Sequence, residues 1–385
     1  MKNKMLMFSA ITLLLVSCKR HENVESEKIS LSKNATLALA TTPAAAPNTF
    51  KVFDQILFYD GYAATVTTPV PAGIIRVSNA KYVKKLTATD LSKLSNSLDI
   101  KVSITPYCDN YDRIGFVGLS FIPKNTAFSE SIGKHIEVGR FITPFMDKNK
   151  TPSLVPYLFS TDNVANLLRD GNWRSTYDIY VVFSVFGVPY TANTEIAGCS
   201  GHNETAYGTV EFINKSGGTD PATVVQMVPI ANNKQLDNYT ASNTDQIGTS
   251  KKTYTVNLTS AITDAKLYLI TSAHGANSGG EEYNRRDHNI YFDNVLKLTY
   301  KPGGKSCEPY RQYNTQANFI YGAFPRSTAD WAASSNWCPG DAIPTRVINL
   351  GNLAAGNHSF RIDVPTAVFN QKQGNILHSV YVQGR

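Results

Sequence analysis

Charge is scarce in this sequence, and no segment concentrates it. Charged side chains make up 17% of the 385 residues, and although the formal net charge is +7, no run of lysine or arginine is longer than two residues. A nucleic-acid-binding protein usually gathers its positive charge into a patch or a basic helix. The dispersed charge therefore argues against nucleic acid as a partner.

Long apolar runs are absent after the first eighteen residues, so no later segment has the length of about 18 apolar residues that a spanning helix needs. The start, MKNKMLMFSAITLLLVSC, joins Lys2 and Lys4 to an apolar stretch and ends in Leu15-Val16-Ser17-Cys18. This order is typical of a bacterial lipoprotein signal, so we expect residues 1–18 to be the signal peptide and Cys18 to be lipidated. The alternative is a secretory signal in which Cys18 is incidental.

Residues 19–48 show little periodicity and end in alanine, threonine and proline, which is typical of a flexible tether. We therefore expect an exported lipoprotein at the outer membrane, on its periplasmic or cell-surface face. The lipid would be the only attachment to the membrane, and we expect a monomer.

Cysteine is also sparse. Besides Cys18 the chain has Cys108, Cys199, Cys307 and Cys338, and an even number in an exported protein favours disulfides. Three pairings are possible, and proximity along the chain favours Cys108 with Cys199 and Cys307 with Cys338. No CxxC motif or His/Cys cluster is present, so we expect no metal site and no cofactor.

What the chain does contain is short alternating segments rich in β-branched and aromatic residues. Examples are GIIRV (73–77), YDIYVVFSVFG (177–187), AKLYLIT (265–271) and HSVYVQG (378–384). Such segments predict strands, and only residues 160–171 predict a helix, ended by Gly171. We expect an all-β protein of two antiparallel sandwiches, at 49–215 and 216–385, joined near residues 214–223.

Two loops with mixed charge precede predicted strands. In CDNYDRIG, Asp112 and Arg113 lie just before a strand, where a carboxylate can act as a general base. In SGGEEYNRRDHNIYF (278–292), Glu281 and Glu282 hold the same kind of position in the second half. Each loop alone is also explained as a turn or a solvated loop. Together they favour a polar ligand site in a crevice between the domains.

Aromatic residues near these loops can complete such a site. Trp337, in SSNWCPGDAIPTR (334–346), looks exposed from its turn-rich surroundings, and an exposed ring suits a sugar face. The alternative is that Trp337 packs over a disulfide.

The sequence also resembles a known family of proteins. Several blocks resemble, in the same order, those of the bacterial secreted peptide-N-glycosidase F family, over residues 49–346. They are TFKVFDQILFYDG (49–61), CDNYDR (108–113), EVGRFITPF (137–145), GTVEFI (208–213), TSAHG (271–275), EEY (281–283) and NWCPGDAIPTR (336–346). The family cleaves the amide between asparagine and the first N-acetylglucosamine of N-linked glycans, in a groove between two eight-stranded antiparallel jelly rolls. We therefore expect two such sandwiches and a glycoprotein or glycopeptide substrate.

The resemblance also implies roles. Asp112 corresponds to the family's essential carboxylate and would orient and deprotonate the attacking water, giving aspartate and a glycosylamine. Glu282 would bind the first sugar across the groove. Arg113 would limit the charge of Asp112 and polarise the amide oxygen. Tyr283 and Trp337 could stack on sugar or peptide, and His274 matches a family histidine. No metal is required. The family's Cys307–Cys338 disulfide is also matched.

Departures from the family pattern leave other functions open. The cysteine pairs that flank both acidic loops in the family are missing, with Gly280 and Asn284 in the second loop. A third carboxylate on a first-domain strand and an arginine near Ser334 or Ser335 also have no counterpart. The main alternative is thus an inactive glycan- or glycopeptide-binding lipoprotein. A copper monooxygenase would need clustered histidines, whereas the seven here form no His-x-His pair.

Overall fold

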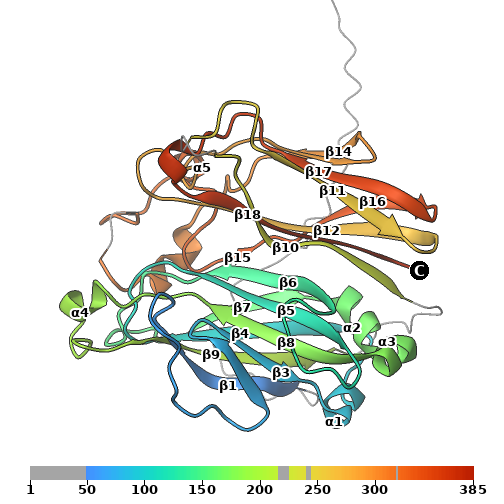
Figure 1. Cartoon of the computed structure of the whole chain (residues 1–385). Helices are drawn as coiled ribbons and strands as arrows, with labels where there is room; N and C mark the ends of the chain where they lie inside the picture. The colour runs from blue at the N-terminus through green and yellow to red at the C-terminus, as the bar shows by residue number, and fades with distance from the viewer. Residues whose placement is uncertain (1–48, 216–224, 240–243, 318–319) are drawn as a thin grey trace, which may run out of the picture. The chain divides into compact units, whose positions relative to one another are not determined.

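The described part of the chain consists of antiparallel sheets that form two sandwiches (Figure 1). The structure is a computed structural model and describes residues 49–215, 225–239, 244–317 and 320–385. The predicted signal peptide (1–18), the tether (19–48) and most of the predicted joining segment lie outside these residues. The described residues all belong to one compact unit.

The first sandwich contains sheets with the strand orders β1-β9-β4-β7 and β15-β6-β5-β8-β3-β2. Its strands are β1 (Thr49–Tyr59), β2 (Ile74–Ser78), β3 (Lys81–Lys85), β4 (Leu98–Pro106), β5 (Ile114–Pro123), β6 (Lys134–Ile142), β7 (Val155–Ser160), β8 (Tyr177–Val185), β9 (Glu204–Asn214) and β15 (Ala342–Ile343). The short β15 comes from the second half of the chain and pairs with β6. This exchange joins the two halves through backbone hydrogen bonds.

The second sandwich contains sheets with the orders β10-β18-β12-β16 and β11-β17-β13-β14. Its strands are β10 (Gln226–Leu236), β11 (Lys251–Leu258), β12 (Ile262–His274), β13 (His288–Phe292), β14 (Val295–Tyr300), β16 (Arg346–Leu353), β17 (Gly356–Asp363) and β18 (Asn375–Gly384). The predicted fold class is confirmed. The second sandwich has the expected eight strands, whereas the first has ten in the described residues because short edge strands and β15 extend it.

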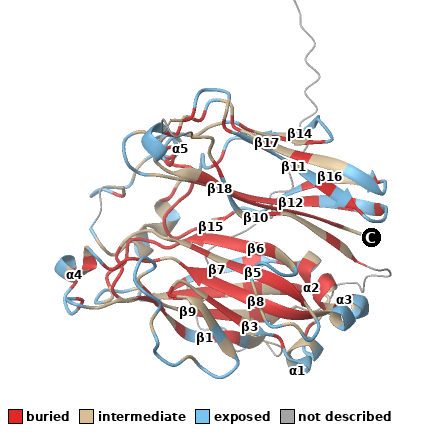
Figure 2. Cartoon of the chain, in the orientation of Figure 1, coloured by how far each residue is buried: buried red, intermediate tan, exposed pale blue. Residues whose placement is uncertain are grey.

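Burial follows the alternation that predicted the strands. Along β7, Val155, Tyr157 and Phe159 are buried and the residues between them are exposed, because successive side chains point to opposite faces. β5, β6 and β8 are buried along most of their length, as Figure 2 shows in red. Such continuous burial means that both faces of this sheet are covered.

One face of β6 is covered by the second sandwich. β6 lies against β10, β12 and β18. Between them is an ion pair of Glu137 and Arg140, whose side chains are both 0% exposed. The interface therefore contains a fully buried charge pair, which also bonds to polar groups of the second sandwich such as the Ser272 and Ser379 hydroxyls.

Helices are short and lie between strands. They are α1 (Ala88–Ser92), α2 (Asp162–Arg169), α3 (Gly171–Thr176), α4 (Ala192–Glu195) and α5 (Thr328–Ser334), with 3₁₀ helices η1 (Glu308–Tyr313) and η2 (Asn370–Lys372). The helix predicted at 160–171 is present as α2. The prediction that Gly171 ends it is wrong, because Asp170 caps a second helix there by accepting from the Trp173 N–H at 3.0 Å. Within the described ranges, no helix has the length and apolarity needed to span a membrane.

Candidate active site

The loop that carries Asp112 is held on both sides by Thr143, the residue that follows β6. The Thr143 hydroxyl accepts from the Arg113 N–H at 2.7 Å and donates to the Tyr111 carbonyl at 3.2 Å. The Thr143 N–H also donates to the Arg113 carbonyl. Asp112 therefore sits in a backbone segment that the neighbouring strand fixes from the side.

Asp112 itself has an unusual environment. Its side chain is half-buried, and its Oδ2 atom is shielded from solvent without a hydrogen-bond partner in the described residues. Burial and then the charge of Glu282 raise the pKa of Asp112 to about 8. An unpartnered carboxylate oxygen with a perturbed pKa is a common property of catalytic acids and bases.

Glu282 comes from the loop between β12 and β13 in the other sandwich. Its Oε2 atom accepts from the Gly275 N–H at 3.0 Å, just after β12 ends. Burial raises the pKa of Glu282, while the Gly275 N–H and the neighbouring Tyr283 side chain act to lower it. The charge of Glu282 acts to raise the pKa of Asp112, although the two residues come from opposite halves of the chain.

An asparagine that the sequence did not single out holds the Glu282 loop. The Asn336 side-chain N–H₂ donates to the carbonyls of Glu282 (2.6 Å), Glu281 (2.9 Å) and Asn284 (3.2 Å). In addition, the Asn284 amide donates to the Gly280 carbonyl at 3.0 Å. Gly280 and Asn284 stand where the family has a cysteine pair, and in this chain hydrogen bonds close the loop instead.

We predict that Asn336→Ala lowers the free energy of unfolding by about 1–3 kcal/mol, because two buried carbonyls and one partly buried carbonyl lose their donor. Urea unfolding at neutral pH measures this change. Asn257→Ala, which alters an exposed asparagine of β11, is the matched control and should have little effect. Equal midpoints for the two variants would contradict the role of Asn336.

The neighbouring Glu281 has a structural position. Arg286 donates to its carboxylate through Nε (2.7 Å) and Nη2 (3.1 Å), and the Val368 N–H donates at 2.9 Å. The side chain of Glu281 is 2% exposed. Glu281 is therefore held by Arg286 and the Val368 N–H, whereas the charge of Glu282 acts on the pKa of Asp112.

The sequence suggested that Arg113 pairs with its neighbour Asp112, but in the structure it does not. Its Nε and Nη2 atoms donate to the carboxylate of Asp109 at 2.6 and 3.0 Å, and Nη2 also donates to the Val188 carbonyl. The Oδ2 atom of Asp109 also accepts from the Val188 N–H, so Asp109 and Arg113 both bond to the same residue. The charge of Arg113 still acts to lower the pKa of Asp112. Among the described residues, Nη1 of Arg113 has no hydrogen-bond partner.

The predicted aromatic residues differ in exposure. Tyr283 is 39% exposed, so its ring is accessible beside Glu282. The expectation of an exposed Trp337 is wrong, since this residue is 6% exposed and its indole N–H donates to the Ala273 carbonyl at 2.8 Å. Trp337 packs with Ile142, Ile270 and other residues between the sandwiches, because its loop folds back against them.

His274 lies at the end of β12, and its ring lies 6.0 Å from that of Trp337. Its Nε2 is 2.6 Å from the hydroxyl of Ser272, which also accepts from Arg140. Burial and then the charge of Arg140 lower the pKa of His274 to about 3. His274 is therefore neutral across the physiological range, and its ring is tied to the buried ion pair.

Both favoured disulfides are confirmed: Cys108–Cys199 and Cys307–Cys338. The first ties the Asp112 loop to the segment 191–205, where Glu195 also accepts from the Asn110 side chain at 2.6 Å. In the described residues, no group of three or more histidine, cysteine, aspartate or glutamate side chains is placed to hold a metal ion.

The raised pKa of Asp112 predicts how stability depends on pH. The unfolded carboxyl ionises near pH 4, whereas the folded one stays protonated to about 8, so the folded state binds more protons between these values. We expect the free energy of unfolding to fall as pH rises through this window. Asp112→Asn removes the ionisation, so it should become more stable relative to the unmodified protein from pH 4 to pH 8. Urea unfolding at several pH values tests this, and a constant difference would contradict it.

Comparison with known proteins shows which family the chain matches. Residues 49–200 match the family described as "Peptide-N-glycosidase F, N terminal", and residues 239–383 match "Peptide-N-glycosidase F, C terminal". The peptide-N(4)-(N-acetyl-beta-D-glucosaminyl)asparagine amidase F of Elizabethkingia miricola is 25% identical over 396 aligned residues. That alignment covers 98% of this chain and 94% of the relative.

Solved structures agree on the fold. PNGF-II superposes with a TM-score of 0.59 at 20% identity, covering 87% of this chain but 65% of that chain. This chain thus matches somewhat less than two thirds of the length of PNGF-II. The PNGase F of Flavobacterium meningosepticum, described as a glycosylasparaginase, superposes with a TM-score of 0.51 at 17% identity, covering 88% of this chain and 95% of that chain.

Proposed function

Because the chain belongs to the peptide-N-glycosidase F family, as its sequence blocks predicted, we propose that it is an amidase acting on N-linked glycoproteins or glycopeptides. The bond cleaved joins asparagine to the first N-acetylglucosamine. The observation that carries this proposal is the shielded Oδ2 atom of Asp112, which has no hydrogen-bond partner in the described residues, in a carboxyl whose pKa is raised by burial and then by the charge of Glu282 from the other sandwich.

Amide hydrolysis needs a water made nucleophilic and a leaving nitrogen that gains a proton. In the proposed mechanism, ionised Asp112 takes a proton from water, and the hydroxyl oxygen bonds to the side-chain carbonyl carbon of asparagine. The carbon–nitrogen bond then breaks, the nitrogen leaves with the proton as a glycosylamine, and aspartate remains. The free Nη1 of Arg113 would donate to the amide oxygen as negative charge develops there.

Glu282 would accept hydrogen bonds from the first sugar, directly or through water. Its fixed position supports this role, because the Gly275 N–H and the clamp by Asn336 restrict its movement. Tyr283, exposed beside it, would contact sugar or peptide. The buried Trp337 would support the substrate-binding surface from inside the protein, and His274 would stay neutral.

The test is incubation of the purified chain with a denatured N-glycosylated protein in ¹⁸O-labelled water. Mass spectrometry of the tryptic peptides should find the asparagine converted to aspartate with one ¹⁸O atom. An endoglycosidase would instead leave one sugar on asparagine. Unchanged glycopeptides in the presence of an active reference amidase would contradict the proposal.

The second candidate is a glycan- or glycopeptide-binding lipoprotein without turnover. The family's third carboxylate has no counterpart on β8, and this absence favours the second candidate. The one acid of β8, Asp178, lies at the start of the strand and is bound to Lys85 and Lys124. This candidate predicts binding of the same glycopeptides without any change in mass.

We further propose export to the outer membrane through lipidation of Cys18. The support is the sequence of residues 1–18, which lie outside the described residues. Membrane retention of a Cys18→Ala variant after cell fractionation would contradict this proposal.

A further inference from the structure

A cavity of about 320 Å³ lies beside the proposed active site, within the second half of the chain. Its lining includes Tyr283, Arg326, Trp331, Ala333 and Trp337. The volume falls within the range of pockets that hold small ligands. None of the proposed catalytic steps uses it.

The cavity adjoins the loop that carries Glu282. Tyr283 forms part of its wall and directly follows Glu282 in the chain. Behind the wall, Tyr321 packs on Trp331 with ring centroids 5.0 Å apart. Because Tyr283 is next to Glu282 and lines the cavity, a substrate bound at Glu282 has its neighbouring groups beside this cavity.

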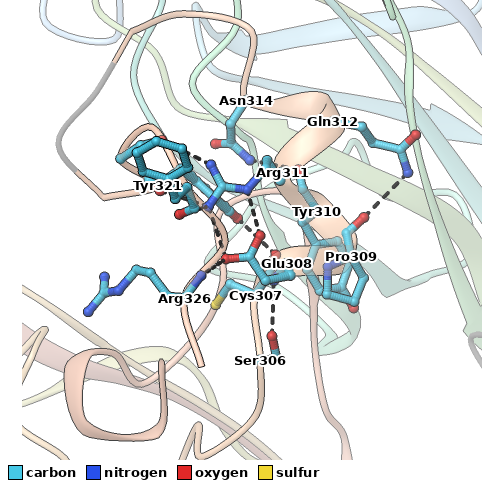
Figure 3. A network of polar contacts seen from close by, with 12 residues as sticks. Ser306, Cys307, Glu308, Pro309, Tyr310, Arg311, Gln312, Asn314, Tyr321 and Arg326 are labelled. Atoms are coloured by element: carbon cyan, nitrogen blue, oxygen red, sulfur yellow. Dashed lines mark hydrogen bonds and ion pairs between the residues drawn. The ribbon is translucent and has the colours of Figure 1, made fainter. Parts of the chain in front are cut away.

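The walls are fixed by a charged network around Glu308 (Figure 3). Its carboxylate accepts from Arg311 Nε (2.5 Å) and Nη2 (3.0 Å), from the Arg326 N–H (2.7 Å) and from Trp331 Nε1 (2.8 Å). Hydrogen bonding to Arg311 lowers the pKa of Glu308 to about 2, so the network stays charged at neutral pH. The Cys307–Cys338 disulfide closes the same loop. The cavity is thus formed before a ligand enters.

The chemistry of the walls favours an apolar occupant. The indole N–H of Trp331 is used by Glu308 and that of Trp337 by the Ala273 carbonyl. The Ser335 hydroxyl donates to the Trp337 carbonyl. The polar atoms of these three side chains already have partners within the protein. The two tryptophans therefore offer their ring faces to a ligand. A sugar would bury hydroxyl groups here with few partners, which is unfavourable.

One charged group in the lining suits an aromatic ring. The guanidinium of Arg326 lies 4.5 Å from the ring centroid of Trp331, and its Nη1 donates to the Ile320 carbonyl at 3.1 Å. A guanidinium held over one ring can also stack on a second.

We propose that this cavity is a subsite for an aromatic or large apolar side chain of the glycopeptide, next to its glycosylated asparagine. The inference rests on the proposed function and makes the chain selective for peptide sequence as well as for the glycan.

The test uses four synthetic peptides, each with one N,N′-diacetylchitobiose on asparagine. One pair carries phenylalanine or serine on the amino-terminal side of the asparagine, and the other pair carries them on the carboxyl-terminal side. We expect kcat/KM to be about tenfold or more higher for phenylalanine in one of the pairs. Calorimetry with the same peptides measures the corresponding ratio of affinities.

Two variants on α5 separate the cavity from its surroundings. Ala333→Trp fills the cavity and should bring the phenylalanine-to-serine ratio close to one. Ala329→Trp makes the same change one turn earlier on the same helix, outside the lining, and should keep the ratio of the unmodified protein. A ratio of one in the unmodified protein for both pairs, or a ratio that Ala333→Trp leaves unchanged, overturns the subsite.

Failure of the amidase function is distinguishable from failure of the subsite. The ¹⁸O experiment with denatured glycoprotein decides whether the chain hydrolyses the bond. If the four peptides are not hydrolysed, the calorimetric ratio alone decides the subsite. Preferential binding of a phenylalanine peptide that Ala333→Trp abolishes supports it, and equal affinities overturn it.

Discussion

The Asp112→Asn variant keeps its fold but loses deglycosylation, with kcat/KM falling about 10²- to 10⁴-fold, the usual contribution of a general base. Asparagine has the shape of aspartate but cannot take a proton from water. The backbone bonds from Thr143 on both sides do not involve the Asp112 side chain, so the loop should hold its position. Quantitative mass spectrometry of a glycopeptide over time measures the loss.

The matched control is Asp287→Asn, the same chemical change at an exposed acid of the Glu282 loop that lies 3.8 Å from Lys301. It should leave kcat/KM nearly unchanged. In the unmodified protein, kcat/KM should rise with pH until Asp112 ionises near 8, because only the ionised form is a base. A rate limited by a group with an ordinary carboxyl pKa, or full activity in Asp112→Asn, would remove Asp112 from the mechanism.

The fold could be predicted from local pattern because the strand signal depends on each segment alone. The alternation in residues 265–271 predicted β12, which the structure extends to Ile262–His274. The exchange of β15 into the first sandwich could not be predicted, since a two-residue strand has no periodicity and its partner β6 lies 200 residues away. Gly171 was misread because the capping Asp170 starts a second helix just where the first ends.

The site was less predictable, because side-chain partners depend on tertiary contacts. The resemblance implies roles for Asp112 and Glu282, and in the structure the charge of Glu282 acts to raise the pKa of Asp112. Asp112 is adjacent to Arg113 in the sequence, so it looked like the natural partner, and only the structure shows that Arg113 pairs with Asp109 and that both bond to Val188. The burial of Trp337 likewise follows from its contact with β12.

Arg140 gives the largest expected effect on stability. All five of its N–H groups are used: Nε and Nη2 bond to Glu137, Nη1 bonds to the Ser272 hydroxyl and the Leu377 carbonyl, and Nη2 also bonds to the Asn233 side chain. Arg140→Met would leave Glu137 charged and buried without its cation. We expect a loss of about 3–5 kcal/mol in the free energy of unfolding, measured by urea titration.

Two further variants distinguish a broken pair from a lost contact. Glu137→Gln with Arg140→Met removes both charges while keeping an acceptor for the Ser379 hydroxyl, so it should recover much of the loss. Lys51→Met breaks the exposed pair of Lys51 with Asp54 and should change stability little. If Arg140→Met costs no more than Lys51→Met, the buried pair does not hold the sandwiches together.

The same substitution should lower activity under conditions where the variant is still folded. Arg140 lies on β6, which pairs with β5 directly after Asp112, and it bonds to Ser272 near the end of β12, just before the Gly275 N–H that holds Glu282. One arginine therefore connects the supports of both acids. We expect kcat/KM to fall in Arg140→Met at temperatures where circular dichroism is unchanged, whereas Lys51→Met keeps full activity. An unchanged kcat/KM would mean that Asp112 and Glu282 keep their positions without this connection.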